Sequence, residues 1–233
     1  MKRRGDPPGD PIQGYFREAL LIGGEATRLY LVRHAQSQGN TGEDLTTGDP
    51  DLTEVGWEQA RRLGARLKTQ RIDHIYASPL QRTRQTASAI AEESGLEVLT
   101  KEDLREVVLG QADYDIRLLP EKERASVARL ILSDGTWDAF PGSEGSEVAR
   151  KRVRSVIREI VNDHPGQRLV LVSHAAFIQT FISVSLGLDR DFIFYPFNAS
   201  ITSVRAKDGR FVIWRLNDVA HLDGLPAGWG GIS

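Results

Sequence analysis

The sequence predicts a three-layer α/β/α sandwich built on a mainly parallel sheet, with one antiparallel edge strand and a small lid insertion. Two continuous apolar runs, at 29–32 and 169–172, have the composition of strands that are buried on both faces. Further strand candidates alternate along the chain with amphipathic helical segments, which is typical of parallel strands joined by helices. The last two strand candidates flank a Lys-Asp-Gly turn at 207–209, which favours an antiparallel hairpin.

Length and composition are those of an ordinary globular α/β protein. The chain has 233 residues, enough for one sizeable domain with an insertion. Its net charge of −2, with 27% charged residues, does not favour nucleic acid or a membrane as a main partner. The absence of cysteine excludes disulfides, thiolate catalysis and Cys-ligated metals. No apolar run approaches the roughly 18 residues of a membrane span, and the stretch 19–22 is too short for a signal peptide, so a cytoplasmic location is expected.

Six segments are predicted as strands, because each is short, apolar or β-branched, and bounded by polar or turn-forming residues. Their predicted ranges are 28–33, 72–77, 96–100, 168–173, 201–206 and 211–216. The first and the fourth are each followed at once by a histidine. Ligands of open α/β sheets bind outside the carboxyl ends of the strands, so these two histidines are candidates for a ligand site.

The predicted helices have one apolar face each. Their ranges are 53–68, 79–94, 145–163 and 175–186. In the first, the apolar or small residues at 56, 60, 63 and 67 share a face, and Thr53 is expected to be the N-cap. In the second, Ser78 is expected to be the N-cap, with Pro79 at the first helical position.

Two segments depart from this alternation. Residues 1–26 are expected to be a partly disordered N-terminal extension, irregular over 5–14 and with a short helix over 16–22, ahead of the main domain at 27–233. From about 107 to 142, glycines and prolines surround one predicted helix at 120–133. This stretch is interpreted as an insertion over the sheet edge, the usual place for a lid.

The residues at the end of the first strand suggest phosphate chemistry. A histidine at a strand terminus, such as His34, can attack phosphorus through a ring nitrogen. Arg33 beside it carries a planar fork of donors that matches phosphate oxygens. Ser37 and Asn40 in the following loop can donate hydrogen bonds to an anion. Taken alone, an Arg-His pair is more often an ordinary strand end.

Three further residues complete the candidate constellation. Arg82 lies in the first turn of a predicted helix, where free N–H groups already attract anions. Glu106, at the start of the insertion, can protonate a leaving alkoxide. His174 can stabilise charge on a transferring phosphoryl group. Each residue alone is more often a solvated surface group or a buried core histidine, and only their combination is specific.

In this combination the chain resembles the histidine phosphatase superfamily, the phosphoglycerate-mutase-like enzymes. The similarity covers nearly all of residues 28–222, and its motifs occur in the family's order. They are Arg33-His34 with Ser37 and Asn40, the Leu-Thr-Glu-Val-Gly run at 52–56, the Ser-Pro-Leu-Gln-Arg-Thr-Arg-Gln-Thr-Ala run at 78–87, Leu104-Arg105-Glu106, Pro141-Gly142-Ser143-Glu144, Val172-Ser173-His174 and the segment 198–201.

The resemblance implies a role for each matching residue. His34 would be the nucleophile that becomes phosphohistidine, and Glu106 the proton donor to the leaving group and then the base that activates water. The phosphoryl oxygens would be held by Arg33, Arg82 and His174, with Asn40, Ser37 and Ala175 also among the substrate-binding residues. No metal and no other cofactor is implied, because phosphoryl transfer depends mainly on positioning and charge stabilisation.

The chain departs from the family pattern at two positions beside His34. The usual glycine is Ala35 and the usual glutamate is Gln36. Alanine has less backbone freedom than glycine, but its side chain is minimal, so we expect it to be tolerated. Ala175 replaces the aspartate of the acid-phosphatase branch, so the proton donor is expected to be Glu106.

A metal-independent phosphomonoester hydrolase acting on a small phosphorylated metabolite is therefore the expected function. The first alternative is a cofactor-dependent phosphoglycerate mutase, which is disfavoured because the Glu-Arg-His-Tyr-Gly run and long insertions of the mutases are absent. The second is a weakly active phosphate-binding or interaction module, and the third is a metal hydrolase, although the five histidines show no paired ligand spacing. Homodimers are common in the family, and the sequence identifies no patch for one.

Overall fold

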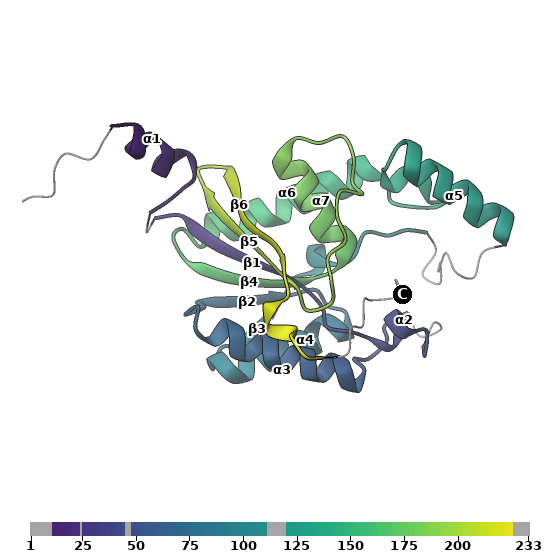
Figure 1. Cartoon of the computed structure of the whole chain (residues 1–233), viewed down its shortest axis with the longest axis horizontal. Helices are drawn as coiled ribbons and strands as arrows, with labels where there is room; N and C mark the ends of the chain where they lie inside the picture. The colour runs from purple at the N-terminus through teal and green to yellow at the C-terminus, as the bar shows by residue number, and fades with distance from the viewer. Residues whose placement is uncertain (1–10, 24, 45–47, 111–119, 226–233) are drawn as a thin grey trace, which may run out of the picture.

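The computed structural model describes residues 11–23, 25–44, 48–110 and 120–225. Its centre is a six-stranded sheet with the strand order β3-β2-β4-β1-β5-β6 (Figure 1). The first four strands in that order are parallel, and antiparallel pairing is confined to one side of the sheet, where β5 pairs with β1 and β6 with β5. The strands are β1 (Thr27–Arg33), β2 (His74–Ala77), β3 (Val98–Thr100), β4 (Arg168–Ser173), β5 (Ile201–Lys207) and β6 (Arg210–Asp218).

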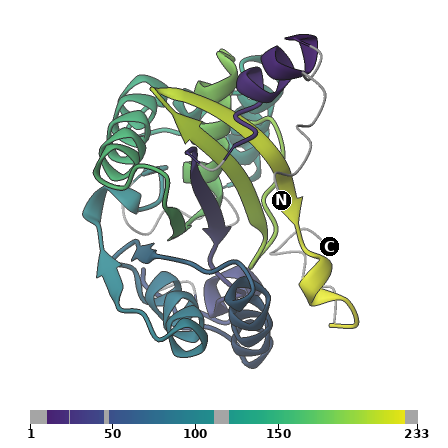
Figure 2. The same cartoon turned by 90° about the vertical axis from the view of Figure 1, so that its left-hand side faces the viewer.

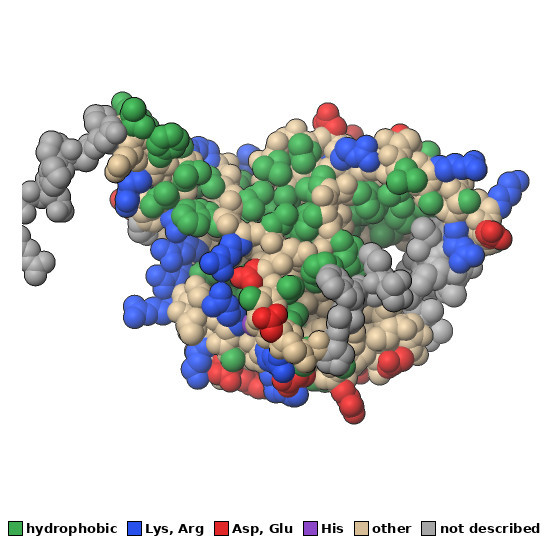
Figure 3. Space-filling model, in the orientation of Figure 1, with side chains coloured by type: hydrophobic (Ala, Val, Ile, Leu, Met, Phe, Trp, Pro, Cys, Tyr) green, Lys and Arg blue, Asp and Glu red, His purple; other side chains and the backbone are tan. Residues whose placement is uncertain are grey.

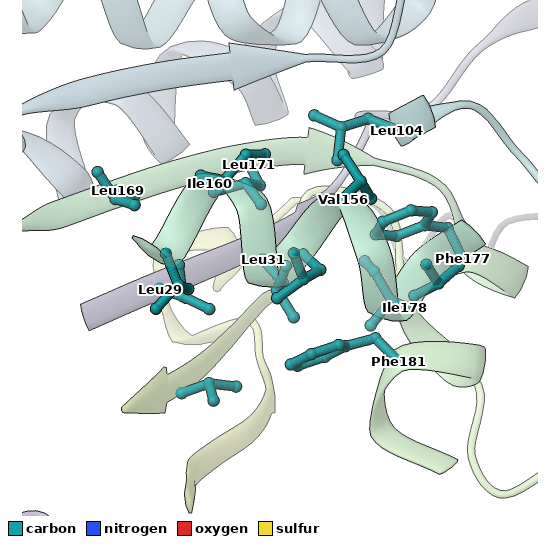
Figure 4. Close-up of a cluster of buried hydrophobic side chains, with 14 of the residues drawn as sticks. Leu29, Leu31, Leu104, Val156, Ile160, Leu169, Leu171, Phe177, Ile178 and Phe181 are labelled. Atoms are coloured by element: carbon teal, nitrogen blue, oxygen red, sulfur yellow. The ribbon is translucent and has the colours of Figure 1, made fainter. Parts of the chain in front are cut away.

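Helices cover both faces of this sheet, so the predicted three-layer sandwich is confirmed (Figures 1 and 2). One face is covered by α3 (Glu54–Lys68) and α4 (Gln81–Ser94), and the other by α6 (Ser146–Asp163) and α7 (Ala175–Leu186). Successive side chains of β1 point to opposite faces of the sheet, so β1 contributes to the apolar cluster on each face. Leu29 and Leu31 join the cluster under α6 and α7 (Figure 4), whereas Tyr30 and Val32 join the cluster over α3 and α4.

Most predicted elements agree with the structure to within about two residues, and Thr53 accepts a hydrogen bond from the Gly56 N–H as the N-cap of α3. The turn between β5 and β6 has Asp208 and Gly209 at positive φ, as a tight hairpin requires. The predicted capping of α4 was wrong. That helix begins at Gln81, with Leu80 as its N-cap; the Ser78 hydroxyl accepts from the Leu80 N–H at 3.4 Å and lies 2.9 Å from a ring nitrogen of His174.

The insertion packs as a third apolar cluster beside the main core. Its helix, α5 (Glu121–Ser133), agrees with the prediction, and the 3₁₀ turn Trp137–Ala139 follows. The Trp137 ring is buried against Phe192, and its Nε1–H donates to Thr180 of α7 at 2.8 Å. These contacts fix the described part of the insertion to the layer formed by α6 and α7, while residues 111–119 lie outside the described residues.

The N-terminal prediction needs correction. A helix is present, but it is α1 (Pro11–Ala19) rather than 16–22, and it occupies residues 11–14 that were expected to be irregular. Pro11 fits the first turn of a helix, where its missing N–H is not needed. Leu21 has a φ of 51°, which no α-helix can include, so the helix ends before it. The expected disorder of residues 1–10 lies outside the described residues. Among the residues that are described, no helix is long and apolar enough to cross a membrane.

Close packing of α3 against the loop after β1 depends on Gly56. A Cβ at this position would lie 1.9 Å from the backbone oxygen of Gln36, two residues after His34. We expect Gly56→Ala to displace that loop, to destabilise the fold by about 1–3 kcal/mol and to lower kcat/KM. Thermal melts and steady-state kinetics test this, with Gly14→Ala in α1 as the control because a Cβ there meets nothing within 4 Å. Unchanged stability and kinetics in Gly56→Ala would contradict the packing argument.

Candidate active site

The two histidines are brought together by the register of neighbouring parallel strands. Arg33 at the end of β1 is paired with Ser173 at the end of β4, so the next residue of each strand is a histidine at the same level. The His34 backbone N–H donates to the Ser173 carbonyl at 2.9 Å. The imidazole centroids are 5.3 Å apart, with the rings edge to face. Both side chains are buried at the carboxyl edge of the sheet, as the sequence predicts.

The surroundings of His34 fix its tautomer. Its Nδ1 lies 2.8 Å from the Ala35 carbonyl oxygen, which can only accept, so Nδ1 carries the hydrogen. The Nε2 lone pair then faces Arg82, whose Nε–H donates to it at 3.3 Å. Burial lowers the pKa of His34 well below its ordinary value, and the charges of Arg82 and Arg33 lower it further. The imidazole is therefore neutral near pH 7, with its free nitrogen pointing at an arginine.

His174 is held in the complementary orientation. Its Nδ1 lies 3.3 Å from Arg82 Nη2, and its Nε2 lies 2.9 Å from Ser78 Oγ. Because an arginine can only donate, Nδ1 accepts and Nε2–H donates to the serine. Burial lowers the pKa of His174 well below its ordinary value, and the charges of Arg82, His34, Arg33 and Arg152 add to the effect.

Arg82 bridges the two imidazoles from the first turn of α4. Its Nη1 lies 3.7 Å from Asp49 Oδ1, and that same oxygen accepts from the Gln81 backbone N–H at 2.7 Å. Thr86, one turn later, donates to the Arg82 carbonyl and accepts from the Ala35 N–H. The guanidinium is thus aimed by groups on both sides of the site.

Arg33 presents an unsatisfied donor. Its Nη1 donates to the Pro196 carbonyl at 2.7 Å, and its guanidinium carbon lies 5.1 Å from the centre of the Tyr195 ring. Its Nε is buried and has no hydrogen-bond partner among the described residues. A buried, unpaired donor of a charged group is costly, and a phosphate oxygen would satisfy it.

Asn40 is oriented by the loop that follows His34. Its Oδ1 accepts from the Ser37 N–H and hydroxyl and from Asn198 Nδ2, at 3.0, 3.2 and 3.0 Å. The oxygen is therefore fully used, and the amide NH₂ is the end that can donate to a ligand. The Ser37 hydroxyl donates its hydrogen to Asn40 Oδ1, so in this arrangement Ser37 orients Asn40. Asn198 also donates to the His34 carbonyl at 3.0 Å.

Glu106 lies over the N-terminus of α7. Its Oε1 accepts from the N–H groups of Val107 and Phe177, at 2.9 and 3.0 Å, and its Oε2 from that of Ala176 at 3.2 Å. The carboxyl group is therefore positioned by the free N–H groups of the helix whose first residue, Ala175, follows His174. The Glu106 charge raises the pKa of Arg82, while burial has the larger, opposite effect, so the two side chains interact electrostatically.

The structure brings every predicted site residue to one edge of the sheet. Sequence reasoning missed the residues that orient them: Asp49, Ser78, Thr86, Arg152 and Asn198. Arg152 donates to the carbonyls of Asp103, Arg105 and Glu106, which fixes the segment carrying Glu106 onto α6. Two signals could have found part of this set. Ser78 follows β2, the neighbour of β4, and Asn198 belongs to a segment already matched to the family.

Within the part of the chain that the structure describes, no three His, Asp or Glu side chains gather where they could hold a metal ion. The positive charge at the site comes from Arg33 and Arg82. With a neutral imidazole between two arginines, the site is suited to an anion whose oxygens take up the arginine donors.

The low pKa values of the two histidines can be tested directly. We expect nitrogen NMR on ¹⁵N-histidine-labelled protein at pH 6.5 to show His34 and His174 as neutral imidazoles. The folded protein then binds fewer protons than the unfolded chain below pH 6.5, so stability falls as the pH is lowered through that value toward the folded pKa values. A protonated His34 or His174 at pH 6.5 would contradict the assigned environment.

Comparison with known proteins agrees with this geometry. The sequence pattern of the histidine phosphatase superfamily (branch 1) matches residues 29–219. Phosphoserine phosphatase 1 of Hydrogenobacter thermophilus is 34% identical over 200 residues, covering 84% of this chain and 94% of that protein. The fold is similar to a mutant phosphoserine phosphatase of Entamoeba histolytica in complex with phosphoserine, with a TM-score of 0.70 and 25% identity over 84% of this chain and 99% of that one. It is also similar to mycobacterial glucosyl-3-phosphoglycerate phosphatase in complex with VO₃, with a TM-score of 0.70 and 28% identity over 82% and 98% of the two chains.

Proposed function

This chain belongs to branch 1 of the histidine phosphatase superfamily and is a histidine-type phosphatase, and from that premise we propose that it hydrolyses small phosphomonoesters through a phosphohistidine at His34, without a metal. The observation that carries the proposal is the tautomer of His34. Its Nδ1–H is fixed on the Ala35 carbonyl, so Nε2 is the free nucleophile at the point where Arg82 is aimed. An incoming phosphoryl group replaces Nε2 as the acceptor for that arginine.

The proposed first step transfers the phosphoryl group to His34. Nε2 donates its lone pair to phosphorus, and the bond between phosphorus and the ester oxygen breaks, with its electron pair leaving on that oxygen. Glu106 in its acid form gives the oxygen a proton, and the alcohol departs. Arg33, Arg82 and Asn40 donate hydrogen bonds to the phosphoryl oxygens and stabilise the charge that spreads over them. His174 Nδ1, which accepts from Arg82 in the free site, becomes a further donor when it takes a proton from solvent as the phosphoryl dianion binds, and it returns that proton when phosphate leaves.

The second step releases inorganic phosphate. Glu106, now a carboxylate, takes a proton from a water molecule whose oxygen attacks the phosphorus. The bond between phosphorus and Nε2 breaks, and its electron pair returns to the imidazole. His34 is again neutral and Glu106 again protonated, so the cycle consumes one water and leaves the charge of the protein unchanged.

We propose that the substrate is a compact phosphorylated metabolite. Two similar proteins are named for phosphoserine and for glucosyl-3-phosphoglycerate, which supports a small polar alcohol bearing the phosphate. The absence of the mutase run after Glu106 supports hydrolysis over phosphoryl transfer between hydroxyls of a phosphoglycerate. The natural substrate is to be found with a panel that begins with these two compounds.

Phosphate release from that panel, with EDTA present, tests the proposal beside a 2-/3-phosphoglycerate interconversion assay. We expect release from a narrow subset of esters, unaffected by the chelator, and no interconversion. Loss of release in EDTA would overturn the metal-free mechanism. Interconversion without release would identify a mutase, and no activity in either assay would favour a binding module.

The acid role of Glu106 gives a prediction with an internal comparison. We expect Glu106→Gln to lower kcat on an alkyl phosphate by about 10²–10⁴-fold, and to affect p-nitrophenyl phosphate much less, because nitrophenolate leaves without a proton. Glu102→Gln, an exposed residue in the preceding 3₁₀ turn, is the matched control. Equal losses on both substrates would show that Glu106 does not protonate the leaving group.

A further inference from the structure

A basic cavity lies away from the active site, between α3 and the side of the sheet formed by β1, β5 and β6; we call it the second basic cavity, after the basic active site. It has a volume of about 230 Å³. Its charged lining consists of arginines and one aspartate: Arg28, Arg66, Arg205, Arg215 and Asp218. Figure 3 shows Lys and Arg side chains gathered on the left of the visible face, the side from which β1 starts.

Two of these arginines are placed directly against each other. Arg28 on β1 and Arg205 on β5 are partners in the antiparallel register, so both side chains leave the same face of the sheet. The Arg205 guanidinium is stacked over the Trp214 ring at 3.8 Å and donates to the Leu21 carbonyl at 2.8 Å. Like charges opposite each other on neighbouring strands are destabilising.

The cavity does not supply the charge that would relieve this repulsion. Asp218 lies 3.1 Å from Arg215 and 3.8 Å from Arg66, so it is already shared by two cations. Among the described residues, no carboxylate forms an ion pair with Arg28 or Arg205. Burial lowers the pKa of Arg205, the charge of Arg28 lowers it further, and Tyr30 raises it.

Guanidinium groups around a small cavity favour a ligand that carries phosphate groups. Each guanidinium can donate two parallel hydrogen bonds to a phosphate group, and several arginines around one cavity suit two adjacent phosphates. We propose that this cavity is a second anion site, which binds a small molecule through a diphosphate group held by Arg28, Arg66 and Arg205.

The site is independent of the catalytic one. Arg28 stands at the start of β1, whereas His34 follows its end, and six residues of strand span about 20 Å. The cavity lining extends along the strands as far as Ile201, opposite Val32. The opposed pair Arg28 and Arg205 lies at the amino end of β1, whereas the histidines follow the carboxyl ends of β1 and β4. A ligand in the cavity therefore makes no contact with the reacting phosphoryl group, and its binding can be measured even if the catalytic proposal fails.

Isothermal titration with methylenediphosphonate, a non-hydrolysable diphosphate analogue, tests the proposal at fixed ionic strength. We expect the wild-type protein to show a site that Arg82→Ala in the active site leaves intact. Arg28→Gln is expected to weaken this site at least tenfold. Without the anion, Arg28→Gln should melt at the same or a higher temperature than wild type, because a repulsion has been removed. With the anion, the wild type should gain melting temperature and Arg28→Gln should gain much less.

Arg61→Gln is the matched control, since Arg61 is an exposed residue on the solvent side of α3 and the change removes the same charge. It is expected to bind methylenediphosphonate like the wild type. The proposal is overturned if Arg28→Gln binds as tightly as wild type, if Arg61→Gln weakens binding equally, or if Arg82→Ala abolishes all binding.

Discussion

Replacement of His34 by alanine is expected to reduce kcat by about 10⁴-fold or more while leaving the fold intact. His34 Nε2 is the atom that the site presents to phosphorus, because its other ring nitrogen is committed to the Ala35 carbonyl. Alanine removes the nucleophile but leaves Arg33, Arg82 and His174 to bind the anion. We therefore expect affinity for inorganic phosphate to persist in a protein that no longer turns over substrate.

His74→Ala is the matched control for this variant. His74 is the first residue of β2, at the amino end of the parallel strands, and its ring packs against that of His164. The reacting histidines follow the carboxyl ends of β1 and β4. It is expected to retain wild-type kcat. Circular dichroism and thermal melts separate loss of the nucleophile from loss of the fold. Substantial turnover in a folded His34→Ala protein would refute the assignment.

The second large effect is expected at Arg82. We expect Arg82→Ala to lower kcat/KM by about 10³-fold, because this guanidinium is the group that donates to both imidazoles and lies where the phosphoryl oxygens would bind. Since the Arg82 charge lowers the pKa of His34 and of His174, its removal is expected to raise both pKa values toward the ordinary value. Burial still lowers both pKa values in this variant, so we expect a pH titration followed by nitrogen NMR to show each histidine protonating at a higher pH than in the wild type.

Arg84→Ala provides the comparison, since Arg84 lies on the exposed face of the same helix and bonds to Gln81. It is expected to change neither kinetics nor histidine titration. If Arg82→Ala lost activity without any change in the histidine signals, the arginine would act on substrate alone and the electrostatic argument would be wrong. If both arginine variants kept wild-type kinetics, Arg82 would have no part in the site.

The sequence was sufficient to bring His34 and His174 together. Both follow continuous apolar runs, and parallel strands buried on two faces end at a common edge of the sheet. In the structure, the register of β1 and β4 pairs Arg33 with Ser173, so the histidine after each strand lies at the same level. Arg82 and Glu106 could be included because they match the family motifs, whereas pattern alone left each as a surface residue.

The orienting residues could not be predicted, because their partners are distant in the chain. Ser78 satisfies the local rule for an N-cap, and only the position of β4 shows that its hydroxyl pairs with His174. In the sequence, Arg152 resembles a solvated cation on a helix. In the structure, it donates hydrogen bonds to backbone carbonyls 46–49 residues earlier in the chain. Arg28 and Arg205 belong to strands that pair only in the folded sheet, so the second basic cavity has no signature in the sequence.

Rapid-quench trapping of the phosphorylated protein shows whether His34 is the nucleophile. The protein is mixed with a ³²P-labelled substrate found by the panel, quenched in alkali within one turnover, and the modified peptide is identified by mass spectrometry. We expect an acid-labile phosphoryl group on His34, and a larger trapped fraction in Glu106→Gln on an aryl phosphate, because that variant lacks the base for the second step. Substrate hydrolysis with no label on the protein, or label on another residue, would contradict the assignment of His34 as the nucleophile.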